Sequence, residues 1–156
     1  MGGGMPDPVD LDNLDRRLLR QLNRDARQSF RDLARELEVS TSTVSNRVKR
    51  LEERGVVTGY IPVVDQRAVG FDLPVVVGLR ISKGKLLEVQ RKIAKDPRVY
   101  GVYDVTGDWD SIVMARFRST EELNDFIKTV LSMAYVERTY TQVVLNTVKE
   151  EKRVLL

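Results

Sequence analysis

The sequence predicts an α+β protein, in which a helical N-terminal domain is joined by an extended linker to a C-terminal βαββαβ domain. Two observations support this fold class. Up to Gly55, apolar residues recur at the three- and four-residue spacing of short amphipathic helices. Beyond Gly55, runs rich in β-branched residues alternate with two further helical stretches. A chain of 156 residues has room for two small domains of this kind.

Three short helices are predicted between residues 12 and 55. Asp12 or Asp15 can cap the first helix, Ser29 the second and Ser40 the third, because short side-chain oxygens accept hydrogen bonds from free backbone amides. Gly55 follows the last helix and is expected to adopt a left-handed conformation. The apolar stripes of the three helices are Leu14, Leu18, Leu19 and Leu22; Phe30, Leu33, Ala34 and Leu37; and Val44, Val48 and Leu51.

The second and third of these helices read as a helix-turn-helix. Ala34 has a small side chain, which lets two helices approach closely at a steep angle, and Val39 between them is expected to enter the core. Glu38 departs from this pattern, because the turn position before Val39 often carries Gly. A positive φ would strain Glu there, which favours a differently built turn.

The third helix is the candidate DNA-reading element. Opposite its apolar stripe it presents hydroxyls, an amide and cations, and it has no acidic residue from Ser40 to Leu51. Hydroxyls and amides can read base edges in the major groove, while cations hold phosphates. An ordinary solvated helix face is the alternative interpretation. The candidate DNA-binding residues are Ser40, Thr41, Ser42, Thr43, Ser45, Asn46, Arg47, Lys49 and Arg50.

Charge is distributed unevenly along the chain. From Arg16 to Gly59 there are 11 basic and 6 acidic residues, whereas from Tyr60 to the end there are 15 basic and 13 acidic residues. A basic N-terminal part fits contact with double-stranded DNA at one end of the protein. Its net charge of +5 is small for tight binding by one copy, so at least two copies are expected to bind together.

The C-terminal part has the element order of a ferredoxin-like fold. Strands are expected at 73–82, 99–106, 111–118 and 136–148, with helices at 84–95 and after the capping box that begins at Ser119. This order predicts an antiparallel sheet with both helices on one face. The second face carries apolar residues such as Val76, so it is expected to pack against another copy of the chain, although the linker or the N-terminal domain is an alternative cover.

Composition excludes several classes of function. The chain has no Cys and no His, which removes disulfides, thiolate chemistry, the usual general base and the commonest metal ligands. It also lacks a glycine-rich phosphate loop and a nucleophile elbow, so no catalytic residue, cofactor or metal site is expected. A ferredoxin-like enzyme with an accessory helical domain is thereby disfavoured. No apolar run is long enough for a bilayer and no secretory segment is evident, so a cytoplasmic protein without membrane contact is expected.

The whole chain from about Leu11 to Val148 resembles the Lrp/AsnC family, also called leucine-responsive or feast/famine regulators. The matching segments are LDNLDRRLLRQL, SFRDLARELEVSTSTVSNRVKRLEERGVVTGY, DVTGDWDSIVMARF and VERTYTQVVLNTVKE. The resemblance implies a sequence-specific DNA-binding transcription regulator whose C-terminal domain forms homodimers that can assemble into octamers. It also implies that amino acids or related small molecules bind between dimers and change assembly or DNA affinity.

The resemblance places an effector site at the turn between the second and third strands and at the start of the last strand. A carboxylate there can take an amino group, and turn amides can take a carboxylate. A simple hairpin turn is the alternative interpretation. Trp109 replaces the family's more usual tyrosine, and Ala134-Tyr135 replaces a frequent Pro-Gly. The candidate effector-binding residues are Gly107, Asp108, Trp109, Asp110, Thr139 and Thr141.

The expected organisation has five parts. They are a flexible arm at 1–11, the helix-turn-helix domain at 12–55, a linker with an extended segment at 56–72, the effector-binding and oligomerisation domain at 73–150, and a tail at 151–156. An effector-independent architectural DNA-binding protein of the same fold remains the alternative function.

Overall fold

The computed structural model describes residues 8–154 and residue 156. The chain divides into two compact units. The first unit extends to Val63 and includes the last residues from Glu150, and the second unit is Val64–Lys149. The expected flexible arm lies outside the described residues except for residues 8–11, which form no regular element.

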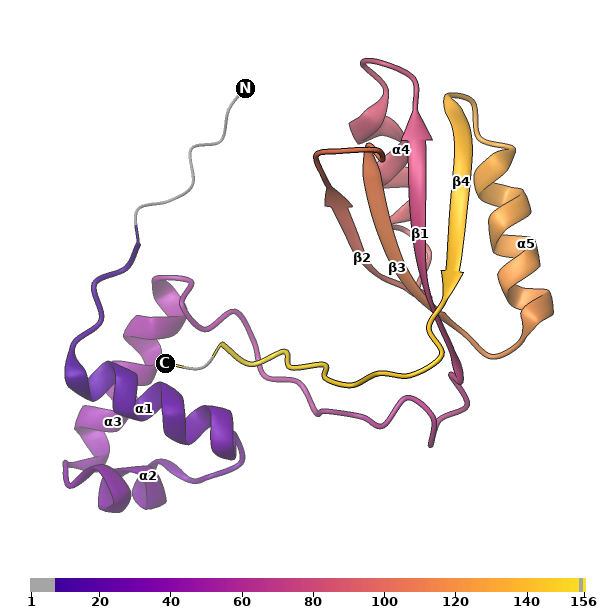
Figure 1. Cartoon of the computed structure of the whole chain (residues 1–156). Coiled ribbons are helices and arrows are strands. Elements are labelled where there is room, and N and C mark those ends of the chain that lie inside the picture. The colour runs from indigo at the N-terminus through magenta and orange to yellow at the C-terminus, as the bar shows by residue number, and fades with distance from the viewer. Residues whose placement is uncertain (1–7, 155) are drawn as a thin grey trace. The chain divides into compact units, whose positions relative to one another are not determined.

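The first unit contains three helices, labelled in Figure 1: α1 (Asn13–Arg24), α2 (Phe30–Leu37) and α3 (Thr41–Glu53). Asp12 caps α1 and forms a reciprocal capping box with Asp15, and Ser29 and Ser40 cap α2 and α3 as predicted. The three helices surround one apolar core. Its buried members are Leu18, Leu19, Leu33, Ala34, Leu37, Val44, Val48 and Leu51.

The turn between α2 and α3 differs from the expectation. Glu38 adopts the left-handed conformation, with φ of 58° and ψ of 44°, and the amide of Val39 donates to the carbonyl oxygen of Ala34. The expectation of a differently built turn was therefore wrong. Buried apolar residues hold α2 and α3 in place. Because the chain must turn sharply between the two helices, Glu38 is kept in an unfavourable backbone conformation. Gly55 has φ of 69°, as predicted.

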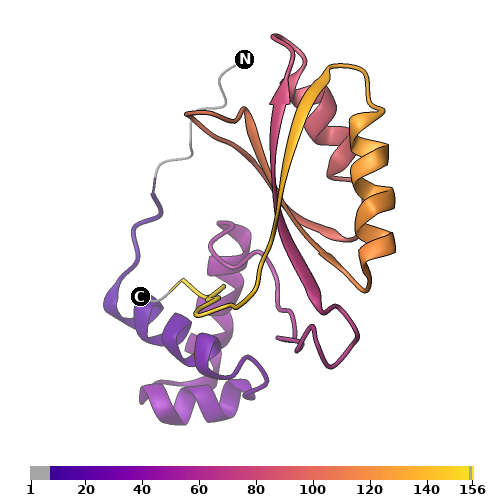
Figure 2. The same cartoon turned by 45° about the vertical axis from the view of Figure 1, so that its right-hand side comes forward.

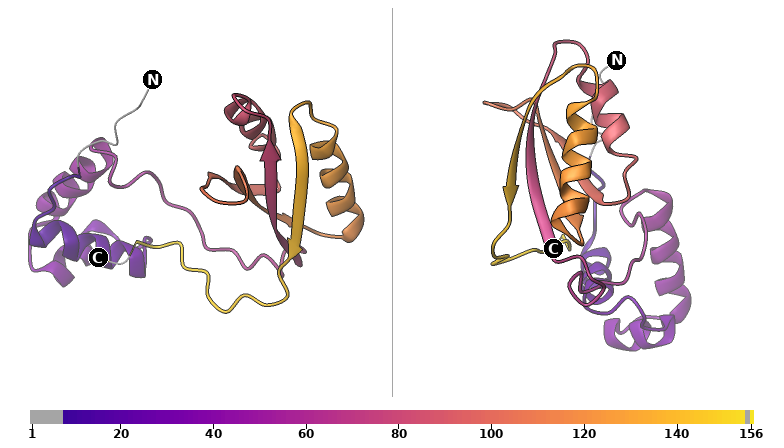
Figure 3. Two further views of the ribbon diagram at one scale, coloured as in Figure 1. Left: turned by 45° about the horizontal axis from the view of Figure 1, so that its top comes forward. Right: turned by 90° about the vertical axis from the view of Figure 1, so that its right-hand side faces the viewer.

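The second unit contains a four-stranded antiparallel sheet in the order β2-β3-β1-β4. Its strands are β1 (Leu73–Ile81), β2 (Val99–Asp104), β3 (Ser111–Phe117) and β4 (Val136–Val143). Its helices, α4 (Leu86–Ile93) and α5 (Thr120–Leu131), lie on the same face of the sheet, as Figures 2 and 3 show. The predicted fold class, with its βαββαβ order, is confirmed.

All four strands end earlier than the sequence suggested, β1 and β3 by a single residue, β2 and β4 by more. In β2, Asp104 is opposite Ser111, the first residue of β3, so residues beyond Asp104 have no paired partner on that strand. In β4, Val143 is opposite Val75, close to the start of β1. A strand at the edge of a sheet can extend only as far as its neighbour offers backbone partners.

The helix-side core of the sheet is built from alternate residues of β1 and β3. Val75, Val77 and Leu79 of β1 are fully buried, and Phe117 of β3 packs against Phe126 of α5 with ring centroids 5.2 Å apart. The intervening residues therefore belong to the opposite face, which carries no helix (Figure 3) and is called the open face below. On β1 and β3 this face carries the apolar residues Val76, Ile112 and Met114, together with Pro74, Gly78, Arg80 and Arg116.

The C-terminal residues return to the helical unit. The side-chain amide of Asn23 donates to the carbonyl oxygen of Val154 at 2.9 Å, and Arg20 donates through Nε to a main-chain oxygen of Leu156. The guanidinium of Arg153 donates to the carbonyl oxygen of Asn23. Residues expected to form a simple tail thus contact α1.

Candidate nucleic-acid interface and effector site

Helix α3 is divided sharply between a buried and an exposed side. Val44, Val48 and Leu51 are almost fully buried in the core of the helical unit. The polar side chains opposite them are exposed, apart from Thr43, Arg47 and Arg50, which are half-buried. The exposed candidates for DNA contact are Ser40, Thr41, Ser42, Ser45, Asn46 and Lys49.

The beginning of α3 is organised by the hydroxyl of Ser40. This oxygen accepts a hydrogen bond from the amide of Thr43 at 3.1 Å and lies 2.9 Å from Oγ of Ser42 and 2.8 Å from Oγ1 of Thr43. Ser40 and Thr43 are therefore already hydrogen-bonded within the helix cap, and a ligand would have to compete with these bonds. Asn46, one turn later, presents an exposed amide with two donors and an acceptor, the group that reads adenine edges in a bidentate manner.

Two of the predicted cations point elsewhere. Arg47 donates through Nη1 to Asp12 and, at 3.2 Å, to Oδ1 of Asp15, and Arg50 donates through Nη2 to Asp15. Asp15 has no exposed side-chain surface, and Oδ2 of Asp12 lies 3.9 Å from Arg50. The four side chains, which we call the acid clamp, join α3 to α1.

The clamp also determines the charge states of its outer members. The amide of Asp15 and then the guanidinium of Arg47 lower the pKa of Asp12, because both donate to the charged carboxylate. The hydrogen bond from Arg47 to Asp12 raises the pKa of Arg47 in turn. Asp12 and Arg47 therefore stay ionised near neutral pH. Lys49 differs from the two arginines, since it is exposed and only loosely paired with Glu53 at 3.7 Å.

In the second unit, the turn at Gly107–Asp110 is tied to β1. Gly107 has φ of 108°, a conformation that glycine adopts readily. The amide of Asp110 donates to the carbonyl oxygen of Leu79 at 2.9 Å, and Oδ2 of Asp110 accepts from the amide of Ile81 at 2.8 Å. Asp110 therefore anchors the turn, whereas Asp108 is exposed.

Trp109 lies on the open face of the sheet, in an aromatic cluster. Its ring stacks on Tyr140 with centroids 5.6 Å apart and planes at 17°, and the guanidinium of Arg138 lies 5.4 Å from its centroid. A Cβ atom added at Gly78 would lie 2.7 Å from the indole, so the glycine makes room for the ring. We call Trp109, Tyr140, Arg138 and Gly78 the indole cluster.

Arg138 and Tyr140 were not predicted from the sequence. Thr139 and Thr141 of β4 were expected at this site, but they are opposite Leu79 and Val77 and so lie on the helix face of the sheet. Thr139 and Thr141 consequently lie on the opposite face of the sheet from Trp109. The alternation of a β-strand assigns Arg138 and Tyr140 to the open face instead, and only the register with β1 shows which set faces the turn.

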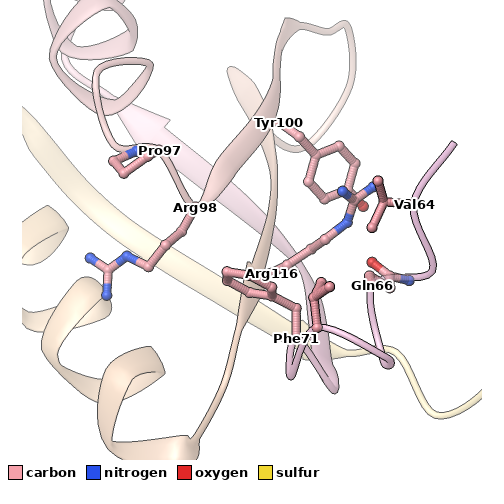
Figure 4. Close-up of a pocket in the computed structure, with 8 residues that line it drawn as sticks. Val64, Gln66, Phe71, Pro97, Arg98, Tyr100 and Arg116 are labelled. Atoms are coloured by element: carbon pink, nitrogen blue, oxygen red, sulfur yellow. The ribbon is translucent and has the colours of Figure 1, made fainter. Parts of the chain in front are cut away.

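A separate cavity of about 210 Å³ lies in the same unit, and Figure 4 shows it. It is lined by the segment from Val64 to Phe71 and by residues at the beginning of β2 and the end of β3. The guanidinium of Arg116 lies 3.9 Å from the ring centroid of Tyr100, and Oε1 of Gln66 is buried without a hydrogen-bond partner. None of the predicted effector residues lines it.

Comparison with known proteins agrees with both units. Residues 11–58 match the family model described as winged helix-turn-helix DNA-binding, and residues 74–154 match the model described as Lrp/AsnC ligand binding domain. The chain belongs to the Lrp/AsnC family. It is accordingly a DNA-binding transcriptional regulator with an Lrp/AsnC ligand-binding domain.

Individual Lrp/AsnC proteins cover nearly the full length of the chain. The HTH-type transcriptional regulator PH1692 of Pyrococcus horikoshii is 45% identical, over 93% of this chain and 98% of the relative. The regulator FL11 of Pyrococcus furiosus is 35% identical, over 90% and 93%. Among solved structures, the transcriptional regulator NMB0573 from Neisseria meningitidis in complex with L-Met has a TM-score of 0.86 at 25% identity, over 93% and 96%.

No helix in residues 8–154 is long and apolar enough to cross a membrane. Within the part of the chain that the structure describes, no three acidic, His or Cys residues gather as a possible metal site.

Proposed function

We propose that this Lrp/AsnC protein reads specific DNA sites with α3, works as an assembly of at least two copies, and responds to an amino acid bound beside the indole cluster. The observation that carries the DNA-reading proposal is the exposed polar side of α3, where Ser42 and Asn46 are accessible opposite a fully buried apolar stripe. A helix held on one side and polar on the other suits the major groove.

The open face of the sheet supports assembly. Val76, Ile112 and Met114 lie there with no helix over them, and Tyr103 and Tyr140 are about half exposed. An apolar face of this kind is stabilised when a second copy covers it. The same face carries Trp109, so the proposed dimer contact and the proposed effector site adjoin.

The indole cluster supports an amino-acid effector through its chemistry. The guanidinium of Arg138 can take a carboxylate, the exposed carboxylate of Asp108 can take an ammonium group, and the indole offers an apolar surface. A methionine complex of the solved relative NMB0573 points to the same class of ligand. Asp110 is a weaker choice for ligand contact, because one of its oxygens already accepts from the amide of Ile81.

Calorimetric titration with each of the twenty amino acids tests the effector proposal. We expect one or a few to bind the parent protein, and we expect Asp108→Asn and Arg138→Gln to weaken that binding about tenfold or more, because each removes a charged partner. Asp125→Asn is the matched control, since it removes an exposed carboxylate from α5. Undiminished binding in both test variants would place the ligand elsewhere. The cavity lined by Tyr100 and Arg116 would then be the next site to alter.

The architectural alternative predicts a different outcome. A protein that only compacts DNA binds no amino acid and protects no discrete sequence. Footprinting on genomic fragments, with and without the amino-acid pool, separates the two functions, since only a regulator yields bounded protected sites. A protein that acts on DNA in this way belongs in the compartment that contains the chromosome, and we infer a cytoplasmic location.

A further inference from the structure

We propose that Asp12 and Asp15 are specificity-determining residues for DNA binding, because they hold Arg47 and Arg50 against α1 and away from the DNA backbone. This inference rests on the proposed role of α3 as the helix that contacts DNA. It concerns residues outside α3, which act through Arg47 and Arg50.

The geometry of the acid clamp restrains both arginines. Asp15 is fully buried at the first turn of α1, and its two oxygens accept from two different guanidinium groups. Arg47 and Arg50 are three residues apart, so they lie on the same side of α3, the side that faces α1. Asp12 adds a second carboxylate at the outer edge, where its side chain is about half exposed.

Release of either arginine toward a phosphate is unfavourable. If Arg47 or Arg50 moved away, Asp15 would keep a buried charge with fewer partners, and a buried charge without compensation is strongly destabilising. The orientation is therefore maintained by the fold rather than by the DNA. Of the three predicted cations of α3, Lys49 is the most exposed, and its partner Glu53 lies 3.7 Å away on the same helix, so it is the cation best placed to follow the DNA backbone.

This restraint favours sequence-dependent contacts. A long, unrestrained cation reaches some phosphate in any register of the protein on DNA, so it strengthens binding to every sequence. Ser42 and Asn46 can satisfy base edges in one register only. Because Arg47 and Arg50 are kept from contacting phosphates in every register, the affinity for random DNA is lowered more than the affinity for the correct site.

The first test compares Asp12→Asn with the parent protein. Asn caps a helix as well as Asp does, so α1 keeps its cap while one charge of the clamp disappears. On a random-sequence duplex, the slope of log affinity against log salt should steepen by up to about 0.9 for each bound copy, because each copy releases one arginine. Per copy, this change makes the affinity gain at 0.1 M salt about eightfold larger than the gain at 1 M salt. Affinity for the selected operator should rise less, so the ratio of the two affinities falls.

Asp32→Asn is the matched control. Asp32 lies in the first turn of α2 and pairs with Arg35 of the same helix, so its removal changes the net charge equally but frees no cation of α3. The second control is the double variant Asp12→Asn with Arg47→Gln, in which the gain on random DNA should vanish. A purely structural role of Asp12 would not produce this reversal.

Three outcomes contradict the proposal. Equal effects of Asp12→Asn and Asp32→Asn would show that the clamp restrains nothing. Weaker binding of Asp12→Asn to both random DNA and operator would show that the clamp supports DNA contact instead. A parent protein that binds no duplex at all would overturn the role of α3 itself, and this inference with it. Asp15→Asn can be added if its circular dichroism melt matches that of the parent, and it should exceed Asp12→Asn in effect.

Discussion

Single residues in α3 differ in what they can contribute to recognition. Asn46 and Ser42 present hydrogen-bonding groups to solvent, Lys49 presents a cation, and Arg47 is held by carboxylates of α1. The helix face seen in the sequence thus separates into residues that we propose to read bases, a cation that we propose to hold phosphates, and internally paired residues. These three classes predict distinct responses to substitution.

The base-reading class should affect site selection. We expect Asn46→Ala and Ser42→Ala to cost about 1–3 kcal/mol of discrimination between the operator and altered sequences. Lys49→Gln should instead weaken binding to all sequences and make the salt dependence shallower. Competition between operator and random duplexes measures both effects. Asn124→Ala on α5 is the control, and unchanged site selection in both alanine variants would show that α3 does not read bases.

A single substitution at Glu38 should stabilise the folded protein. Its positive φ costs about 1–2 kcal/mol for a side chain with a Cβ, and Gly adopts this conformation without that cost. After allowance for the greater freedom of Gly in the unfolded chain, we expect Glu38→Gly to raise the free energy of unfolding by about 0.5–1 kcal/mol. Urea titration is the measurement. Glu36→Gly, within α2, should lower the free energy of unfolding by about 1 kcal/mol. A lower free energy of unfolding in both variants would contradict the strain at Glu38.

Local signals explain which residues were correctly assigned from the sequence. The caps at Ser29 and Ser40, and the left-handed Gly55, depend on neighbours within a few positions, so the sequence contains the whole cause. The contact of Arg47 with Asp12 spans 35 positions, and it depends on how α1 packs on α3. Periodicity gives the faces of each helix but not which polar residue of one helix meets which residue of another.

At the scale of secondary-structure elements, the register of the sheet likewise could not be derived from local sequence signals. The expected strands were found, but the choice of Thr139 over Tyr140 required the pairing of β4 with β1. A shift of one residue exchanges the two faces of a strand, so a correct strand can still yield a wrong site. Gly78, which makes room for Trp109, had only its lack of a side chain as a signal.

The segment Val56–Val64 is an element without regular structure, and its composition predicts a role in assembly. Ile61 and Val63, on either side of Pro62, are 78% and 88% exposed, which is unusual for apolar residues of a solvated tether. We expect the double substitution Ile61→Ser with Val63→Ser to weaken the dimer while each unit stays folded. Sedimentation equilibrium gives the dimer dissociation constant, and Leu87→Ser, an exposed apolar position on α4, is the control. An unchanged constant in the linker variant would show that the segment is passive.

At the scale of the whole molecule, charge limits what one copy can do. The balance of +5 from Arg16 to Gly59 omits Asp12 and Asp15, and their inclusion lowers it to +3. Because the clamp pairs these acids with two cations of α3, the net positive charge left for phosphates is small. We therefore expect tight binding to need more than one helical unit on the same DNA.

Assembly should be visible in the DNA sequence itself. Two copies related by a twofold axis place two α3 helices in successive major grooves, so selected operators should be rough palindromes with half-sites about 34–36 Å apart or at multiples of that spacing. Selection from random duplexes gives the sequence, and light scattering gives the mass of the free protein. A monomer at micromolar concentration, or a selected site with a single half-site, would contradict this arrangement.

The contact of the last residues with α1 has a consequence for the order of synthesis. The core of the helical unit comes entirely from residues before Leu73, so a ribosome can release it for folding early. Its bonds from Arg20 and Asn23 to Leu156 and Val154 can form only after those last residues have been synthesised. A peptide fused after Leu156 would begin beside the second half of α1, in the unit that also carries α3. Tags placed after Leu156 for purification or imaging of this regulator are thus better judged by their effect on DNA binding than assumed neutral.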